Sequence, residues 1–161
     1  MKLLVFSDSH GNVFPMREAV LRNRDADCIL YLGDGLRDLE EIRREFPIPI
    51  LAVRGNCDFG MEGYSEEESI TLDGVRILLT HGHRYGVKGG TGAFLTYARA
   101  KGYHIALYGH THLPHESYHG EGQPLYLMNP GSIGKRERGI YSFGVITLQS
   151  QAVLLSFGTV Q

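Results

Sequence analysis

Aspartate and histidine side chains recur in this sequence at points where short apolar runs end. Asp8 and His10 directly follow the run 2–7. The motif GHTH (109–112) follows the run 104–108 in the same way. Carboxylate oxygens and imidazole nitrogens are ligands for divalent transition metals. This placement therefore predicts a metal site rather than scattered polar residues.

Three further apolar runs are followed by side chains that can bind a metal. Asp34 follows the run 28–32, Asn56 follows 48–53, and His81 and His83 follow 75–80. In open α/β sheets the ligand crevice lies outside the carboxyl ends of the strands, so we expect all these side chains to converge on one site. Asp8 and His10 are two residues apart, and an extended backbone would project both to the same face.

The hydrophobic periodicity predicts the elements that position these residues. Amphipathic patterns predict helices over 15–23, 36–46 and 91–101. Three early strands alternating with helices predict a parallel α/β arrangement. Later in the chain we expect a hairpin of 69–72 and 75–80 on an Asp-Gly turn, and antiparallel strands over 140–148 and 152–160. The acidic stretch 64–69 is expected to be an exposed bend, and NPGS (129–132) is expected to serve turn geometry only.

Length and charge narrow the class of protein. A chain of 161 residues is long enough to bury one core, which predicts a single domain. The net charge of -2 argues against a general nucleic-acid surface and leaves a nucleic-acid partner undecided. We expect no membrane association, because no apolar run reaches eighteen residues. The absence of a secretory-type start and the presence of only two cysteines, Cys28 and Cys57, predict a cytoplasmic location.

The succession DSH, GD, GN, HGH and GHTH resembles the pattern of the calcineurin-like metallophosphoesterase superfamily over nearly the whole chain. The form GNCD and the small size are most similar to its compact YfcE-type phosphodiesterase branch. This resemblance implies a four-layer α/β/β/α sandwich, with one domain over residues 1–161. It also implies a phosphodiesterase that acts on a small phosphodiester by direct attack of a hydroxide bridging two metals.

The resemblance implies roles for individual residues. Asp8, His10 and His112 would hold the first metal, Asn56, His81 and His110 the second, and Asp34 would bridge both. Mixed nitrogen and oxygen ligands favour manganese, iron, nickel, cobalt or zinc over magnesium or calcium, and manganese is our expectation. Asn56, Cys57 and His83 are the candidate catalytic residues. His83 would either approach the substrate or orient His81.

Cys57 departs from the wider superfamily, in which many members have histidine after GN. In those members the histidine is assigned to protonating the leaving oxygen. A thiol is a poorer acid and hydrogen-bond donor than an imidazolium. The substitution predicts a preference for phosphodiesters with good leaving groups and slow turnover of alkyl phosphomonoesters.

Two other classes of function fit the same pattern. Related folds serve as non-catalytic protein-interaction scaffolds, as in the retromer subunit that resembles this branch. A nuclease or cyclic-nucleotide phosphodiesterase would share the metal site and differ only in the substrate groove. The intact set of histidines and aspartates favours catalysis over the scaffold. A homo-oligomer is a further expectation, since small members of this superfamily often self-associate.

Overall fold

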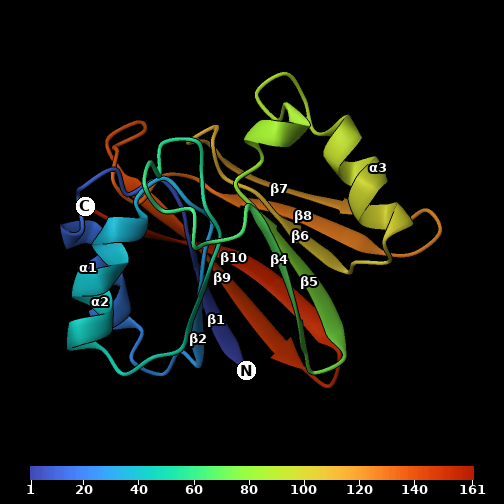
Figure 1. Ribbon diagram of the computed structural model, residues 1–161. Coiled ribbons are helices and arrows are strands. Elements are labelled where there is room, and N and C mark those ends of the chain that lie inside the picture. Colours follow the sequence, from blue (N-terminus) through green and yellow to red (C-terminus); the bar gives the residue numbers. More distant parts are fainter.

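The computed structural model describes residues 1–161, which form two five-stranded sheets and three α-helices (Figure 1). The α-helices are α1 (Phe14–Arg22), α2 (Leu39–Glu45) and α3 (Gly92–Ala100), and the 3-10 helices are η1 (Leu36–Asp38) and η2 (His83–Tyr85). Helix α1 begins with proline in its first turn, where the missing N–H has no partner to lose.

The first sheet has the strand order β10-β9-β1-β2-β3. Its strands are β1 (Lys2–Phe6), β2 (Cys28–Tyr31), β3 (Ile50–Ala52), β9 (Tyr141–Gln149) and β10 (Ala152–Val160). Strands β1, β2 and β3 pair in parallel, whereas β9 pairs antiparallel with both β1 and β10. The predicted parallel start and antiparallel end of the chain are both confirmed, and they share one sheet.

The second sheet has the strand order β4-β5-β6-β8-β7. Its strands are β4 (Glu67–Leu72), β5 (Val75–Thr80), β6 (Ile105–Leu107), β7 (Pro114–His119) and β8 (Leu125–Pro130). Strands β5, β6 and β8 are parallel, and the edge strands β4 and β7 are antiparallel to their neighbours. The predicted Asp-Gly hairpin is confirmed, with positive φ at both Asp73 and Gly74 as a tight turn of this kind requires.

Alternation of side chains along the strands produces the layers. In β1, Leu3 and Val5 enter a buried cluster shared by the two sheets. Leu4 and Phe6, on the opposite face, pack with residues of α1 and α2 in a separate cluster. A third cluster joins the outer face of the second sheet to Phe94 of α3. The order of layers is therefore helix, sheet, sheet, helix, and the predicted four-layer sandwich is confirmed (Figure 1).

Several predicted boundaries were wrong, for physical reasons. The predicted helix 36–46 starts as the 3-10 turn η1, where the Leu36 N–H donates to a carboxylate of another loop, Asp58, at 2.9 Å. Strands β7 and β8 were not predicted at all. The sequence of β7, PHESYH, is polar and largely exposed at a sheet edge, and the apolar part of β8 is only four residues long.

The prediction of an exposed acidic bend over 64–69 was also partly wrong. Glu67 begins strand β4, and its carboxylate accepts hydrogen bonds from the hydroxyls of Tyr85 and Tyr97. Glu66 forms ion pairs with Arg54 at 3.1 Å and with Arg84 at 2.6 Å. These ion pairs fix the position of the acidic segment. They also link the loop after β3, which carries Arg54, to the loop after β5, which carries Arg84.

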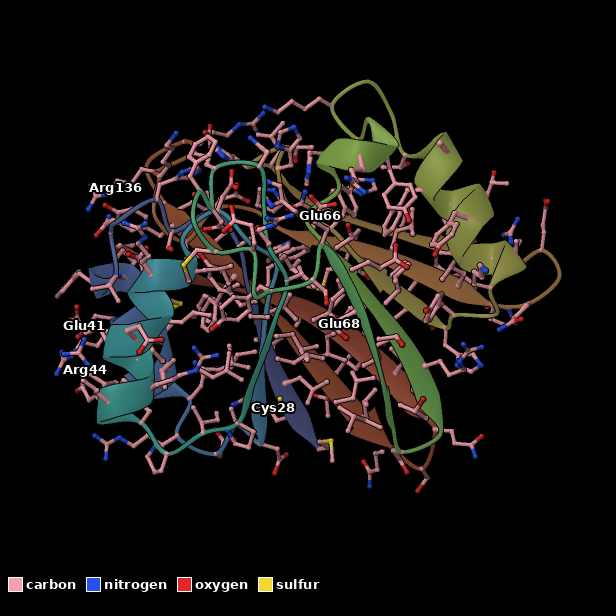
Figure 2. All side chains as sticks on the ribbon, in the orientation of Figure 1. Cys28, Glu41, Arg44, Glu66, Glu68 and Arg136 are labelled. Atoms are coloured by element: carbon pink, nitrogen blue, oxygen red, sulfur yellow. The ribbon has the colours of Figure 1, made fainter.

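Figure 2 places Cys28 at the end of the molecule opposite Glu66. The partly buried Cys28 side chain packs against the cluster between the sheets and acts there as a small hydrophobic residue. No helix in the structure is both long and apolar enough to cross a bilayer.

Candidate metal centre

Loops from both sheets meet at one edge of the sandwich, and they carry the predicted ligands. Asp8, Asp34 and Asn56 follow β1, β2 and β3, whereas His81 and His110 follow β5 and β6. Figure 1 shows these loops together at the same end of the molecule. The expected convergence of strand ends is therefore what the fold produces.

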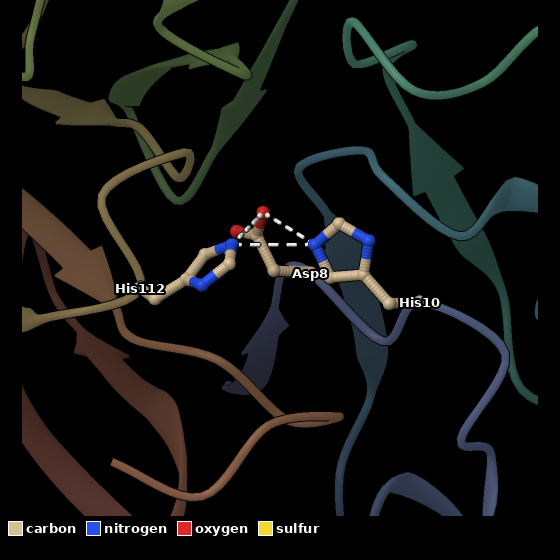
Figure 3. Close-up of side chains that lie close together, drawn as sticks. All are labelled: Asp8, His10 and His112. Carbon is tan, nitrogen blue, oxygen red and sulfur yellow. Dashed lines mark hydrogen bonds and ion pairs between the residues drawn. The ribbon is translucent and has the colours of Figure 1, made fainter.

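The first group of ligand atoms comes from Asp8, His10 and His112 (Figure 3). Asp8 Oδ1 lies 3.1 Å from His112 Nε2 and 3.5 Å from His10 Nε2, and the two Nε2 atoms are 3.2 Å apart. Two atoms bound to one ion at about 2.1 Å, with tetrahedral or octahedral angles, are roughly 3.0–3.4 Å apart. The spacing of this group therefore suits a single shared cation.

The second group comes from Asp34, His81 and His110, on the loops after β2, β5 and β6. Asp34 Oδ2 lies 3.3 Å from His81 Nε2, and the rings of His81 and His110 have centroids 5.0 Å apart. Asp34 Oδ2 also lies 3.9 Å from His10 Nε2 of the first group. Asp34 thus stands between the two groups, which is the place a bridging carboxylate would occupy.

The backbone that presents these ligands differs from the extended conformation we predicted for Asp8 and His10. Their φ angles are +59° and +47°, in the left-handed region. Asp34, His110 and His112 have positive φ as well, between +60° and +68°. Strand β1 ends at Phe6, so tight turns rather than strand pleating aim these side chains inward. Left-handed conformations at non-glycine residues are uncommon and cluster at functional sites.

Two buried polar atoms at the centre of the site have no hydrogen-bond partner. These are Asp8 Oδ1 and His81 Nε2, which face each other at 4.0 Å. The opposite nitrogen of His81, Nδ1, donates to the Leu32 carbonyl at 2.7 Å, which leaves Nε2 directed at the carboxylates. A metal-bound histidine commonly donates its other N–H to a carbonyl in this way. The donor set therefore fits a pair of divalent cations.

Both carboxylates are held in the ionised form that a cation requires. Burial opposes ionisation of Asp8, but the adjacent imidazoles of His10 and His112 and the charge of His81 hold its pKa well below the usual range. At Asp34, burial is again outweighed by His81 and by the backbone N–H of Cys57, which lower the pKa to about 2. Each carboxylate is thus negatively charged near neutral pH.

The pKa values of His81 and His110, the histidines of the second group, are shifted in opposite directions. Burial and the nearby charge of His81 lower the pKa of His110 to about 4, so its imidazole is neutral near neutral pH. Burial disfavours the charged form of His81, but Asp34 and Asp8 outweigh it and raise the pKa. A cation between these carboxylates would take the place of that proton, since only the neutral imidazole ligates.

Asp58 holds the loops of the site together, and the sequence reasoning assigned it no role. Its carboxylate is buried and accepts four backbone hydrogen bonds of 2.7–2.9 Å. The donors are the N–H groups of Asp34, Gly35, Leu36 and Gly55. One side chain therefore fixes the loop after β2 against the loop after β3. The position of Asp58 in the GNCD motif was the feature of the sequence that could have indicated this role.

Close contact between those two loops also depends on glycine. A side chain at Gly55 would overlap the Asp34 carboxylate, and one at Gly33 would overlap the Gly55 backbone. Gly33 additionally has a φ of +94°. The glycines before Asp34 and Asn56 thus allow the two loops to approach each other.

The NPGS motif contributes more than the turn geometry we predicted. The buried Asn129 donates from Nδ2 to the Gly109 carbonyl at 2.8 Å and to Thr111 Oγ1 at 2.9 Å, inside the GHTH loop. Ser132 Oγ donates to the Asp8 carbonyl at 2.8 Å. These residues therefore position the loops that carry the first group of ligands.

The three candidate catalytic residues lie at the site in different ways. Cys57 Sγ is within 4.8 Å of ligand atoms of His10 and Asp34. The exposed Asn56 amide donates to Cys57 Sγ at 3.4 Å, and its ligation of a metal stays a prediction. His83 lies beside the second group, 5.5 Å from His81 between ring centroids, with a buried Nδ1 that has no partner. The Leu32 carbonyl, rather than His83, orients His81 by a hydrogen bond.

Comparison with known protein families shows which family this chain belongs to. The family model described as the calcineurin-like phosphoesterase superfamily domain matches residues 1–151. The chain belongs to this superfamily. The predicted resemblance is thereby confirmed, and with it the assignment to a family of phosphoester hydrolases.

Individual members of the superfamily are similar over most of their length. "Probable metallophosphoesterase YsnB" of Bacillus subtilis is 31% identical, with 98% of this chain and 90% of that protein covered. "Phosphodiesterase YfcE" of Escherichia coli is 29% identical, with 83% and 79% covered. A solved structure of a predicted phosphoesterase from Streptococcus pneumoniae has a TM-score of 0.80 at 27% identity, covering 97% and 87%. The YfcE-type branch predicted from the GNCD motif is confirmed.

Proposed function

We propose that this chain hydrolyses phosphodiesters with two divalent transition-metal ions, manganese being the expected pair. The observation that supports the proposal most strongly is the pair of buried, unpartnered atoms Asp8 Oδ1 and His81 Nε2 between two groups of ligands. Buried polar atoms without partners are costly, and two such atoms facing each other at 4.0 Å call for a bound cation.

The proposed ligands divide between two positions. Asp8, His10 and His112 would hold one metal, Asn56, His81 and His110 the other, and Asp34 both. The chemistry that a pair of divalent metals supplies when bound is a lowered pKa for water and compensation of the charge on the phosphate. In the overall reaction a water oxygen bonds to phosphorus, the bond from phosphorus to one ester oxygen breaks, and the departing oxygen takes up a proton.

The protein's own residues determine how easily that proton is delivered. Partial desolvation and the negative charge of Asp34 raise the pKa of the Cys57 thiol. Burial and the charge of His81 lower the pKa of His83, so its imidazole is neutral near neutral pH. Neither group is a strong acid at pH 7, which supports our proposal that substrates with good leaving groups react fastest.

Cys57→His should restore a general acid beside the departing oxygen. We expect it to raise turnover of β-glycerol phosphate, an alkyl monoester, by at least about tenfold, since a fully positioned general acid supplies roughly 10²–10⁴-fold. Turnover of bis(p-nitrophenyl) phosphate should change much less, since its leaving group needs no proton. Phosphate release and p-nitrophenol absorbance measure the two reactions.

Cys57→Ser is the matched control, because a hydroxyl of similar size is no better an acid than the thiol. It should leave the ratio of the two turnover rates unchanged. Equal effects of Cys57→His on both substrates, or no effect on β-glycerol phosphate, would contradict this account of the leaving-group preference.

Hydrolysis after metal removal tests the proposed function itself. The chelated protein is supplied singly with manganese, nickel, magnesium or zinc and given bis(p-nitrophenyl) phosphate beside p-nitrophenyl phosphate. We expect transition metals to restore cleavage and the diester to be the better substrate. Metal-restored cleavage that favours the monoester would contradict the proposed phosphodiesterase activity.

A non-catalytic scaffold is the alternative from another class of function. Such a protein would have no use for Asp8 Oδ1 and His81 Nε2 buried without partners, and burial of both would only lower its stability. Absence of any cleavage by protein shown to contain two metals would favour this alternative. A nuclease or cyclic-nucleotide activity would share the metal centre, and only the neighbouring groove distinguishes these from other diesterases.

A further inference from the structure

A groove of about 310 Å³ opens directly from the metal centre on its His10 side. Its wall includes three residues already placed at the site, His10, Asp34 and Cys57. Its size is at the lower end of the range for small-molecule sites, about 300–1,000 Å³. A phosphate bound at the metals would therefore have one of its ester arms directed into, or past, this groove.

Phe59 also lines the groove, and its side chain is 78% exposed. It is the most exposed of the large hydrophobic side chains in the structure. Met61 lines the same wall and adds a polarizable thioether surface. An exposed aromatic ring beside a reaction centre offers a stacking platform for a flat ring, because aromatic faces stack on nucleobases with little sequence preference.

The loop that carries Phe59 is held in place rather than free. Asp58, its neighbour, is fixed by four backbone hydrogen bonds, and the Arg37 guanidinium donates to the Phe59 carbonyl at 3.3 Å. This hydrogen bond uses only Nη2 of Arg37, which also lines the groove, so the other N–H groups of its guanidinium are available to a ligand there. A flat ring bearing hydrogen-bond acceptors suits this combination better than a plain hydrocarbon.

The two other carboxylates of the groove are engaged by the protein. Asp58 accepts only backbone N–H groups, and Asp38 Oδ2 accepts the Ser9 hydroxyl and the Gly11 N–H. The groove therefore presents an aromatic ring and free donors next to a cation site. These features match a ligand that carries a phosphate and an aromatic heterocycle.

We infer that this groove binds a nucleoside arm of the phosphodiester substrate, with the base stacked on Phe59 and its acceptors facing Arg37. The inference rests on the proposed function and narrows its substrate to nucleoside phosphodiesters. His10 and Asp34 of the metal centre also line the groove. The base of a nucleoside attached directly to the reacting phosphate would therefore lie in the groove.

Two substrates with the same leaving group test this inference. Thymidine 5′-(p-nitrophenyl phosphate) and ethyl p-nitrophenyl phosphate both release p-nitrophenol and differ only in the second arm. We expect kcat/KM to be about tenfold higher for the nucleoside ester, since stacking of one base on an aromatic ring has an effect of this order. Phe59→Ala should bring the ratio of the two kcat/KM values close to one, and Phe59→Trp should maintain it.

Phe14→Ala is the matched control, because Phe14 is also exposed, at 58%, and lies outside the groove. It should leave the ratio at its original value. A ratio near one in the unmodified protein, or the same ratio in Phe59→Ala, would overturn the inference. Either result would leave the proposed function intact, provided that both esters are cleaved.

Calorimetric titration with thymidine 5′-(ethyl phosphate) and with diethyl phosphate separates the two claims. The metal-loaded protein should bind the nucleoside diester about tenfold more tightly, and Phe59→Ala should remove the difference. This difference without hydrolysis of any diester would sustain the binding inference and reject the proposed function. Equal binding of both diesters would overturn the inference whatever the protein hydrolyses.

Discussion

Asp34→Asn is expected to lower hydrolysis of bis(p-nitrophenyl) phosphate by more than about 100-fold, because even partners outside the ligand shell of a metal site contribute about 10–100-fold. Asp34 lies between both groups of ligand atoms, 3.3 Å from His81 and 3.9 Å from His10. Its carboxylate is ionised, with a pKa lowered to about 2, and the amide would remove that charge from both metal positions. Metal content after dialysis against manganese should fall together with activity.

Asp73→Asn is the matched control, since it makes the same chemical change in the exposed turn between β4 and β5. Asp73 has a φ of +50°, which asparagine also adopts readily, so stability should be unaffected. Activity and metal content of this variant should equal those of the unmodified protein. Near-normal metal content in Asp34→Asn would contradict the assignment of Asp34 as the bridging ligand.

Asp58→Ala is expected to have the largest effect on stability. The buried carboxylate accepts four backbone hydrogen bonds, and its removal leaves those N–H groups without partners. We expect the free energy of unfolding of the metal-free protein to fall by about 3 kcal/mol or more, given about 1–3 kcal/mol for each buried unsatisfied group and incomplete additivity. Urea unfolding in the presence of a chelator measures this quantity.

Asp25→Ala provides the comparison for that measurement, since the Asp25 carboxylate is exposed and its only ion pair is with Lys2. An exposed pair of this kind contributes little to stability, because water screens both charges. A loss of stability in Asp58→Ala no larger than in Asp25→Ala would show that the loops after β2 and β3 are held by other contacts.

The candidate metal-binding residues could be recognised from the sequence, but their backbone conformation could not. Asp8 and His10 could be recognised because both follow an apolar strand and recur with GHTH in the order of the family pattern. Their left-handed backbone could not be read from residue spacing, because aspartate and histidine adopt that conformation only where surrounding contacts impose it. The Ser132 hydroxyl bound to the Asp8 carbonyl is one such contact, from 124 residues away.

The positioning residues were the part of the site that local patterns missed. Asn129 and Asp58 act through hydrogen bonds to backbone groups of distant loops, and polar residues in turns usually serve only their own turn. Strand β8 was missed for a related reason. Its short apolar run takes its conformation from pairing with β6 and β7, which lies outside any window of sequence.

The most direct test of the account is a titration of metal-free protein with manganese in which bound metal and hydrolysis of bis(p-nitrophenyl) phosphate are followed in the same sample. The account predicts two manganese ions per chain, with activity rising as the second position fills. It also predicts that Asp34→Asn prevents filling of at least one position. Full activity in the chelated protein, or full activity at one metal per chain, would contradict it.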